Sequence, residues 1–170
     1  MPINDVIALA IGIVACITDV RSARIPNALT FSGVITGLLF HALAPGGAGF
    51  AASGEGCLVG LAVFFLPFAL GGLGAGDVKL LAALGAWLGP TDIMWSAAYT
   101  AIAGAALSLI VAIARGYVRT ALSNVWMLLC HWSVVGIRPL RELSLEGSRG
   151  PRLAYAVPIL LGLTVTLWLR

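Results

Sequence analysis

Six continuous apolar stretches run through this 170-residue chain, and they constrain its fold more than any other feature. They cover residues 3–18, 28–44, 57–73, 78–88, 93–114 and 153–169. None of them alternates strictly between apolar and polar residues, as the strands of a membrane β-barrel do. Charged residues make up only 10% of the chain, whereas a soluble domain carries about 25%. The sequence therefore predicts an all-α polytopic membrane protein with six transmembrane helices in a single domain, residues 1–170.

The positions of the basic residues predict how these helices are oriented. If the chain crosses the membrane six times, nine of its ten lysine and arginine residues lie on one side, and only Arg170 lies on the other. Loops that face the cytoplasm carry an excess of these residues. The sequence therefore predicts a protein of the cytoplasmic (inner) membrane. Asp5, Glu55 and Asp92 are expected on its outer side.

The fourth apolar stretch, residues 78–88, is the weakest part of this topology. As a helix it would cover only about 16 Å, at 1.5 Å per residue. A crossing normally takes about 20 residues. A re-entrant loop is the alternative, but it would place Arg115 and Arg119 outside, against the charge rule. We therefore favour a short crossing that thins the bilayer locally.

Residues 115–152 are expected to lie on the cytoplasmic side. Between residues 117 and 135, apolar side chains recur at a spacing that forms one face of a helix. These side chains are Val118, Leu122, Val125, Trp126 and Leu129. The pattern predicts a helix that lies in the cytoplasmic interface of the membrane. Proline and glycine residues predict a loop over the rest of this segment, and another loop outside the membrane over residues 45–56.

Glycine and tryptophan residues are assigned to packing and to the membrane boundary. Glycines spaced four residues apart let helices approach closely, and three such pairs occur at positions 33 and 37, 56 and 60, and 85 and 89. Trp87, Trp95 and Trp168 are expected near the outer boundary, where tryptophan forms an aromatic belt. The three cysteines are widely spaced and indicate neither a zinc site nor a disulfide framework.

Two aspartates border apolar stretches on the predicted cytoplasmic side. Asp19 ends the first stretch, and Asp77 opens the fourth, directly after Gly74-Ala75-Gly76. Because two crossings separate them, both are expected at the same boundary. An ionisable group near hydrocarbon is costly and marks a functional site by default. Each aspartate also has a structural interpretation, because Asp77 could cap a helix and Asp19 could pair with a nearby arginine at position 21 or 24.

Two carboxylates that meet at one water molecule can hydrolyse a peptide bond. They share a proton, so that one acts as general base on the water while the other polarises the scissile carbonyl. This chemistry requires no metal and no cofactor, and we expect neither. Gly74 and Gly76 would let the backbone before Asp77 turn tightly and approach a substrate strand. The hypothesis is a catalytic pair, Asp19 and Asp77, with Gly74 and Gly76 in the active-site loop.

The combination of Asp19-x5-Ile25-Pro26-Asn27 with Gly74-x-Gly76-Asp77-x-Lys79 resembles the type IV prepilin peptidases, which are Gly-x-Gly-Asp aspartyl proteases. The resemblance implies that Asp19 and Asp77 cleave the short basic leader that precedes the hydrophobic helix of pilin-like precursors. The implied partners are these precursors and the lipid bilayer, without nucleic acid. Tyr155 and Pro158 also resemble the start of the family's last span, but Ala154 replaces a proline there, and we assign that end no function.

The resemblance also bears on methylation. Larger members of the family carry an amino-terminal domain with Cys-x-x-Cys pairs that is associated with methylating the new amino terminus. Here the first apolar stretch begins at residue 3, so the expectation is a peptidase without N-methyltransferase activity. This short form resembles the peptidases of tight-adherence (Flp) pilus systems, and the archaeal preflagellin peptidases are an alternative.

Two other functional classes compete with a peptidase. A small proton- or cation-coupled transporter could use the two aspartates as a relay, because acids in membranes also mark ion pathways. Such a relay needs acids near mid-membrane, whereas both aspartates are expected at one boundary. A scaffold of a secretion machine is the third possibility, and it would tolerate asparagine at both positions.

Overall fold

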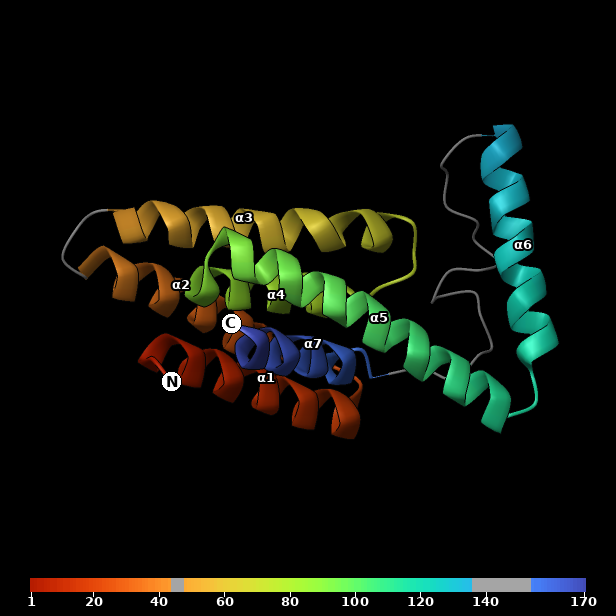
Figure 1. The fold of residues 1–170 in the computed structure, drawn as a ribbon, viewed down its shortest axis with the longest axis horizontal. Coiled ribbons are helices and arrows are strands. Elements are labelled where there is room, and N and C mark those ends of the chain that lie inside the picture. The colour runs from red at the N-terminus through yellow and green to blue at the C-terminus, as the bar shows by residue number, and fades with distance from the viewer. Residues whose placement is uncertain (44–47, 136–153) are drawn as a thin grey trace.

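The structure is a computed structural model that describes residues 1–43, 48–135 and 154–170. Over these ranges the chain forms seven helices and no strand, so the predicted all-α class is confirmed. The helices are α1 (Ile3–Ser22), α2 (Asn27–Leu43), α3 (Ala48–Ala69), α4 (Ala75–Leu88), α5 (Pro90–Ala114), α6 (Val118–Val135) and α7 (Ala156–Leu169). All of them except α6 pack into one elongated bundle (Figure 1).

Several helices of the bundle suit a membrane. By length and composition, α1, α3 and α5 are long and apolar enough to cross one. The apolar helices α2 and α7 are shorter, with 17 and 14 residues. Together with α4, these helices account for the six predicted apolar stretches. The chain is therefore a multi-pass membrane protein, and the count of six crossings stays a prediction.

Helix α4 lies at the centre of the bundle. Every residue from Leu80 to Leu88 is buried, and the helix packs against α1, α2, α3 and α5 (Figure 1). A helix that is apolar on all sides is stable only when it is enclosed. This enclosure explains how the shortest of the apolar stretches can form a stable helix, because α4 contacts other helices instead of lipid on all sides.

Glycines allow the close approach of α3 and α2 to α4, as their spacing predicted. A Cβ atom at Gly56 would overlap the carbonyl oxygen of Gly85, and one at Gly85 would overlap that of Gly56. Gly60 lies equally close to the α4 backbone, and Gly33 and Gly37 of α2 meet small residues of α4. The packing role predicted for these residues is confirmed.

The outer loop predicted over residues 45–56 is wrong for residues 48–56, which are helical because α3 begins at Ala48. The Ser53 hydroxyl is buried and donates to the carbonyl oxygen of Ala86 at 2.6 Å. Contacts of this kind with α4 outweigh the low helix propensity of the glycines in this segment. Residues 44–47 lie outside the described ranges.

The aromatic belt prediction is wrong for Trp87. Its side chain is only 3% exposed, and its indole N–H donates to the carbonyl oxygen of Gly33 at 2.9 Å. The physical reason is that Trp87 lies on the enclosed helix α4. Trp95 and Trp168 are 57% and 82% exposed, as residues at a membrane boundary would be.

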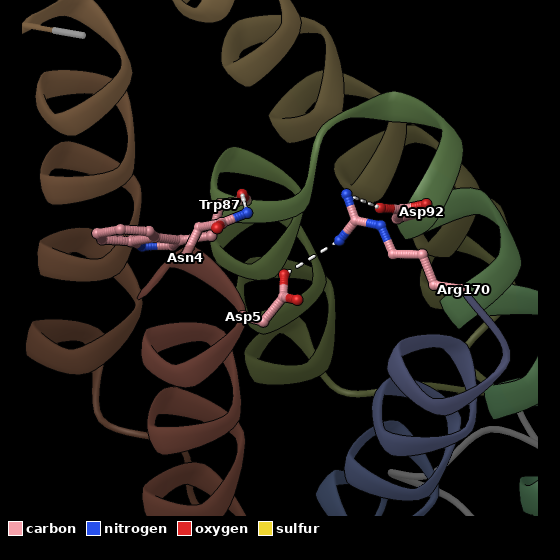
Figure 2. A network of polar contacts seen from close by, with 5 residues as sticks. All are labelled: Asn4, Asp5, Trp87, Asp92 and Arg170. Carbon is pink, nitrogen blue, oxygen red and sulfur yellow. Dashed lines mark hydrogen bonds and ion pairs between the residues drawn. The ribbon is translucent and has the colours of Figure 1, made fainter. Parts of the chain in front are cut away.

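A network of polar contacts joins helix ends at one end of the bundle (Figure 2). Arg170 follows α7, and its guanidinium group lies 3.1 Å from Asp5 of α1 and 2.9 Å from Asp92 of α5. Asp5 is buried, so its charge requires such a partner. Asn4 also donates to the carbonyl oxygen of Trp87, which places the last turn of α4 at this end. Asp5, Asp92 and Arg170 thus lie at one end of the bundle, which agrees with their predicted placement on the same side of the membrane.

Helix α6 stands apart from the bundle and runs across its long direction (Figure 1). Its exposed apolar side chains include Leu122, Val125 and Trp126. A helix that lies along a membrane surface, across the direction of the spans, would have this orientation. The interfacial placement stays a prediction, and residues 136–153 of the same predicted segment lie outside the described ranges.

Candidate active site

Asp77 lies in the first turn of α4, just before the apolar stretch, and is 8% exposed. Its Oδ2 accepts the backbone N–H of Gly74 at 3.1 Å, while its own N–H donates to the Gly74 carbonyl oxygen at 3.1 Å. The side chain therefore closes the turn that begins the helix, as one half of a capping box does. The interpretation of Asp77 as a capping residue is confirmed. A catalytic role stays open, because the capping hydrogen bond holds the carboxylate in place without changing it chemically.

The two motif glycines provide space and not an unusual backbone, which corrects the predicted tight turn. Gly74 has φ −82° and ψ 150°, an extended conformation that other residues also adopt. A Cβ atom there would lie 3.1 Å from Oδ2 of Asp77, and one at Gly76 would lie 3.3 Å from Cβ of Ile25. The turn itself contains Gly71, with φ 80°. Gly74 thus makes room for the Asp77 carboxylate, and Gly76 lets the start of α4 lie close to Ile25 in the chain that follows Asp19.

Asp19 lies in the last turn of α1 and is half-buried. Its Oδ2 accepts the backbone N–H of Ala156, the first residue of α7, at 3.2 Å. Among the described residues, the ion pairs all involve Arg170, so neither Arg21 nor Arg24 pairs with Asp19. The ion-pair interpretation of Asp19 is therefore wrong. Its side chain turns towards α7 and the interior of the site instead.

The structure brings Asp19 and Asp77 to the same end of the bundle. Helices α1 and α4 pack against each other, and Ile25, in the turn that follows α1, lies beside Gly76, the residue before Asp77. Burial raises the pKa of the Asp77 carboxyl to about 6, the hydrogen bond from Gly74 lowers it, and the charge of Asp19 raises it. Near pH 6 the pair can therefore hold a proton that two separate, solvated carboxyls would have lost.

Tyr155 is a site residue to which the sequence analysis assigned no function. It directly precedes Ala156, whose backbone N–H donates to Asp19. Its ring packs edge-on against Phe64, with 6.1 Å between ring centroids. Gly104 makes room for the hydroxyl, because a Cβ atom there would lie 2.7 Å from it. The resemblance of Tyr155 and Pro158 to the family pattern was the signal that could have identified this residue.

A polar contact joins the two sequence motifs. The Lys79 ammonium donates to Oδ1 of Asn27 at 3.0 Å and lies 5.6 Å from the ring centroid of Phe31. Asn27 begins α2 directly after the turn that follows Asp19, and Lys79 lies two residues after Asp77. The contact therefore fixes the chain after one aspartate to the helix that carries the other.

Among the residues that the structure describes, no cluster of three or more histidine, cysteine, aspartate or glutamate side chains could hold a metal ion. The groups that the described residues bring to the site are two carboxyl groups and backbone N–H donors.

Comparisons with known proteins bear on this site. The sequence profile of the type IV leader peptidase family matches residues 6–109, which is more than half of the chain and includes both aspartates. Searches of the curated proteins and of the solved structures found no match. From the profile match, this chain belongs to the type IV leader peptidase family, whose members are aspartic peptidases.

Proposed function

We propose that this protein cleaves the leader peptide from type IV prepilin-like precursors, with Asp19 and Asp77 as its catalytic pair. The observation that carries the proposal is that both acids lie at one end of the bundle, within the matched region. The surrounding groups support it, because Ala156 holds Asp19 and Gly74 holds Asp77 by backbone hydrogen bonds. Orientation by fixed backbone donors is a general requirement for efficient catalysis.

The chemistry we propose is hydrolysis by a water molecule between the two carboxyls. The ionised carboxylate removes a proton from the water, whose oxygen attacks the scissile carbonyl carbon while the protonated carboxyl donates a hydrogen bond to the carbonyl oxygen. The tetrahedral intermediate then breaks its carbon–nitrogen bond, and the leaving nitrogen takes a proton from the pair. The two carboxyls titrate as a unit, so we assign the proton to the pair and not to either residue.

The substrates we propose are Flp-type pilins, pseudopilins or preflagellins, each with a basic leader before a hydrophobic helix. Cleavage would take place at the cytoplasmic face of the inner membrane, as the distribution of lysine and arginine indicates. The proposal assigns this chain peptide cleavage without methyl transfer. The position of both acids at one end of the bundle favours hydrolysis over an ion relay, which needs acids along a path through the membrane.

The test of this proposal includes the pH dependence of cleavage. We expect the rate to fall in acid, where both carboxyls are protonated and no base is left. We expect it to fall again as pH rises, because the shared proton is then lost. Since burial and the charge of Asp19 raise the pKa of Asp77, the alkaline decline should lie above the pH range in which a solvated aspartate loses its proton. The measurement is kcat/KM for a pilin-like precursor across the pH range, and a rate that rises steadily into alkali would contradict a shared proton.

The proposed topology predicts which positions a membrane-impermeant thiol reagent can reach. In a variant without native cysteines, Glu55→Cys and Thr91→Cys should be labelled in intact cells. Arg24→Cys and Ser123→Cys should be labelled only after permeabilisation. The reason is that α4 connects the end with the aspartates to the end with Arg170. If Thr91→Cys were protected until permeabilisation, α4 would not cross the membrane.

A further inference from the structure

A cavity of about 500 Å³ lies between α3 and α5 and extends to the start of α7. Its surface is mostly apolar, and it opens at the side of the bundle, where Met94 is 55% exposed. Three alanines of α5 contribute to the lining, so a second helix could approach α5 closely. The residues that line the cavity include Phe64, Met94, Ala97, Ala98, Ala101 and Tyr155.

The cavity adjoins the candidate active site. Tyr155 lines it and directly precedes Ala156, whose N–H donates to Asp19. Leu73, the residue before the Gly74 turn, also lines the cavity. Met94 lies one turn into α5, towards the end of the bundle that holds Arg170. The cavity therefore extends from residues next to the two aspartate motifs along the side of the bundle.

We propose that this cavity receives apolar side chains from the hydrophobic helix of the precursor, next to the scissile bond. This inference rests on the proposed function and names the part of the enzyme that recognises the substrate. In the proposed topology, a precursor helix would run from the cleavage site towards the outer side of the membrane, which is the direction in which the cavity extends. The volume suits a few apolar side chains from one face of a helix, but not the helix itself, and pockets of this size are usual for specific binding. The rest of the helix would stay in lipid.

Cross-linking tests the occupant without depending on cleavage. A photoreactive amino acid is placed at Met94, which lines the cavity, or at Ile102, which is 66% exposed on the same helix but outside the lining. Both proteins carry Asp77→Asn and are mixed in liposomes with a synthetic precursor that has a basic leader and one hydrophobic helix. An adduct with the precursor at Met94 and not at Ile102 would support the inference. Adducts at Met94 with lipid alone, or with a second copy of this chain, would overturn it.

The second experiment measures the kinetics of cleavage, with protein that keeps both aspartates. Ala101→Leu partly fills the cavity, whereas Ala106→Leu adds the same side chain to an exposed position of α5 outside the lining. We expect Ala101→Leu to raise KM for the full precursor on the order of tenfold with little change in kcat. The preference for the full precursor over a peptide without its hydrophobic helix should fall, and Ala106→Leu should change neither value.

The outcomes separate this inference from the proposed function. Equal losses on both substrates, or no effect of Ala101→Leu on either, would overturn the substrate cavity while leaving the peptidase intact. Absence of cleavage by the unmodified protein would count against the proposed function, and the cross-linking result would still decide whether the cavity binds a precursor helix.

Discussion

Asp19→Asn and Asp77→Asn are each expected to reduce cleavage of a pilin-like precursor roughly a thousandfold or more, and the double variant is expected to be little worse than either. The reason is that the two carboxyls act as a unit on one water molecule, so the loss of either removes the shared proton or the base. Purified protein in liposomes, with cleavage followed over time, provides the measurement. Additive losses in the double variant would contradict a shared mechanism.

The asparagine variants keep the structural contacts of the two acids. An amide oxygen can still accept the N–H of Gly74 or of Ala156, so both variants should insert and stay monodisperse. Glu55→Gln is the matched control, because it neutralises an exposed acid of α3 that lies outside the site. Substantial cleavage by either aspartate variant would refute the catalytic pair.

Gly56→Ala is expected to destabilise the bundle by roughly 3 kcal/mol, at the upper end for an overpacked core. The new Cβ atom would meet the carbonyl oxygen of Gly85, a backbone group that cannot turn aside. Helix α3 would have to move away from α4, and the hydrogen bond from Ser53 to Ala86 would lengthen. Thermal unfolding in detergent, together with the amount of protein inserted into membranes, measures the effect.

Gly54→Ala provides a control two residues away on the same helix. A Cβ atom there would have no atom within 4 Å, so the packing is unchanged. Replacing glycine by alanine inside a helix stabilises it by roughly 0.5–1 kcal/mol. The two substitutions should therefore shift the unfolding temperature in opposite directions. Shifts of the same sign and size would show that α3 and α4 do not pack as described.

The sequence was sufficient to predict that Asp19 and Asp77 lie at the same end of the bundle. Counting apolar stretches determines at which end each acid lies, and this parity does not depend on how the helices are arranged. The same reasoning could not identify α4 as the enclosed helix, since its apolar residues form no distinct face. Trp87 was placed at the membrane boundary for the same reason, because a tryptophan near a helix end suits a boundary as well as a core.

The remaining parts of the site depend on contacts between distant segments. The hydrogen bond from Ala156 to Asp19 joins residues separated by 137 positions, and no local pattern predicts such a pairing. Tyr155 belongs to the site because α7 packs between α1 and α5, an arrangement that is decided by the whole bundle. Gly74 and Gly76 were assigned to an active-site loop, but Gly76 lies in the first turn of α4, and the reason for glycine at both positions is the space that Asp77 and Ile25 occupy.

The length of the enclosed helix α4 bears on the level of the membrane at which the proposed cleavage takes place. With 14 residues, the helix is about 21 Å long at 1.5 Å per residue, roughly 9 Å shorter than a hydrocarbon core of about 30 Å. The last turn of α4 is held by the hydrogen bond from Asn4, which directly precedes Asp5 of the Arg170 network. In the proposed topology, the bilayer thins around the bundle, so that Asp77 at the other end of α4 lies at the cytoplasmic surface. The length of α4 then acts as an internal ruler, which sets the position of the scissile bond by distance from the far side of the protein.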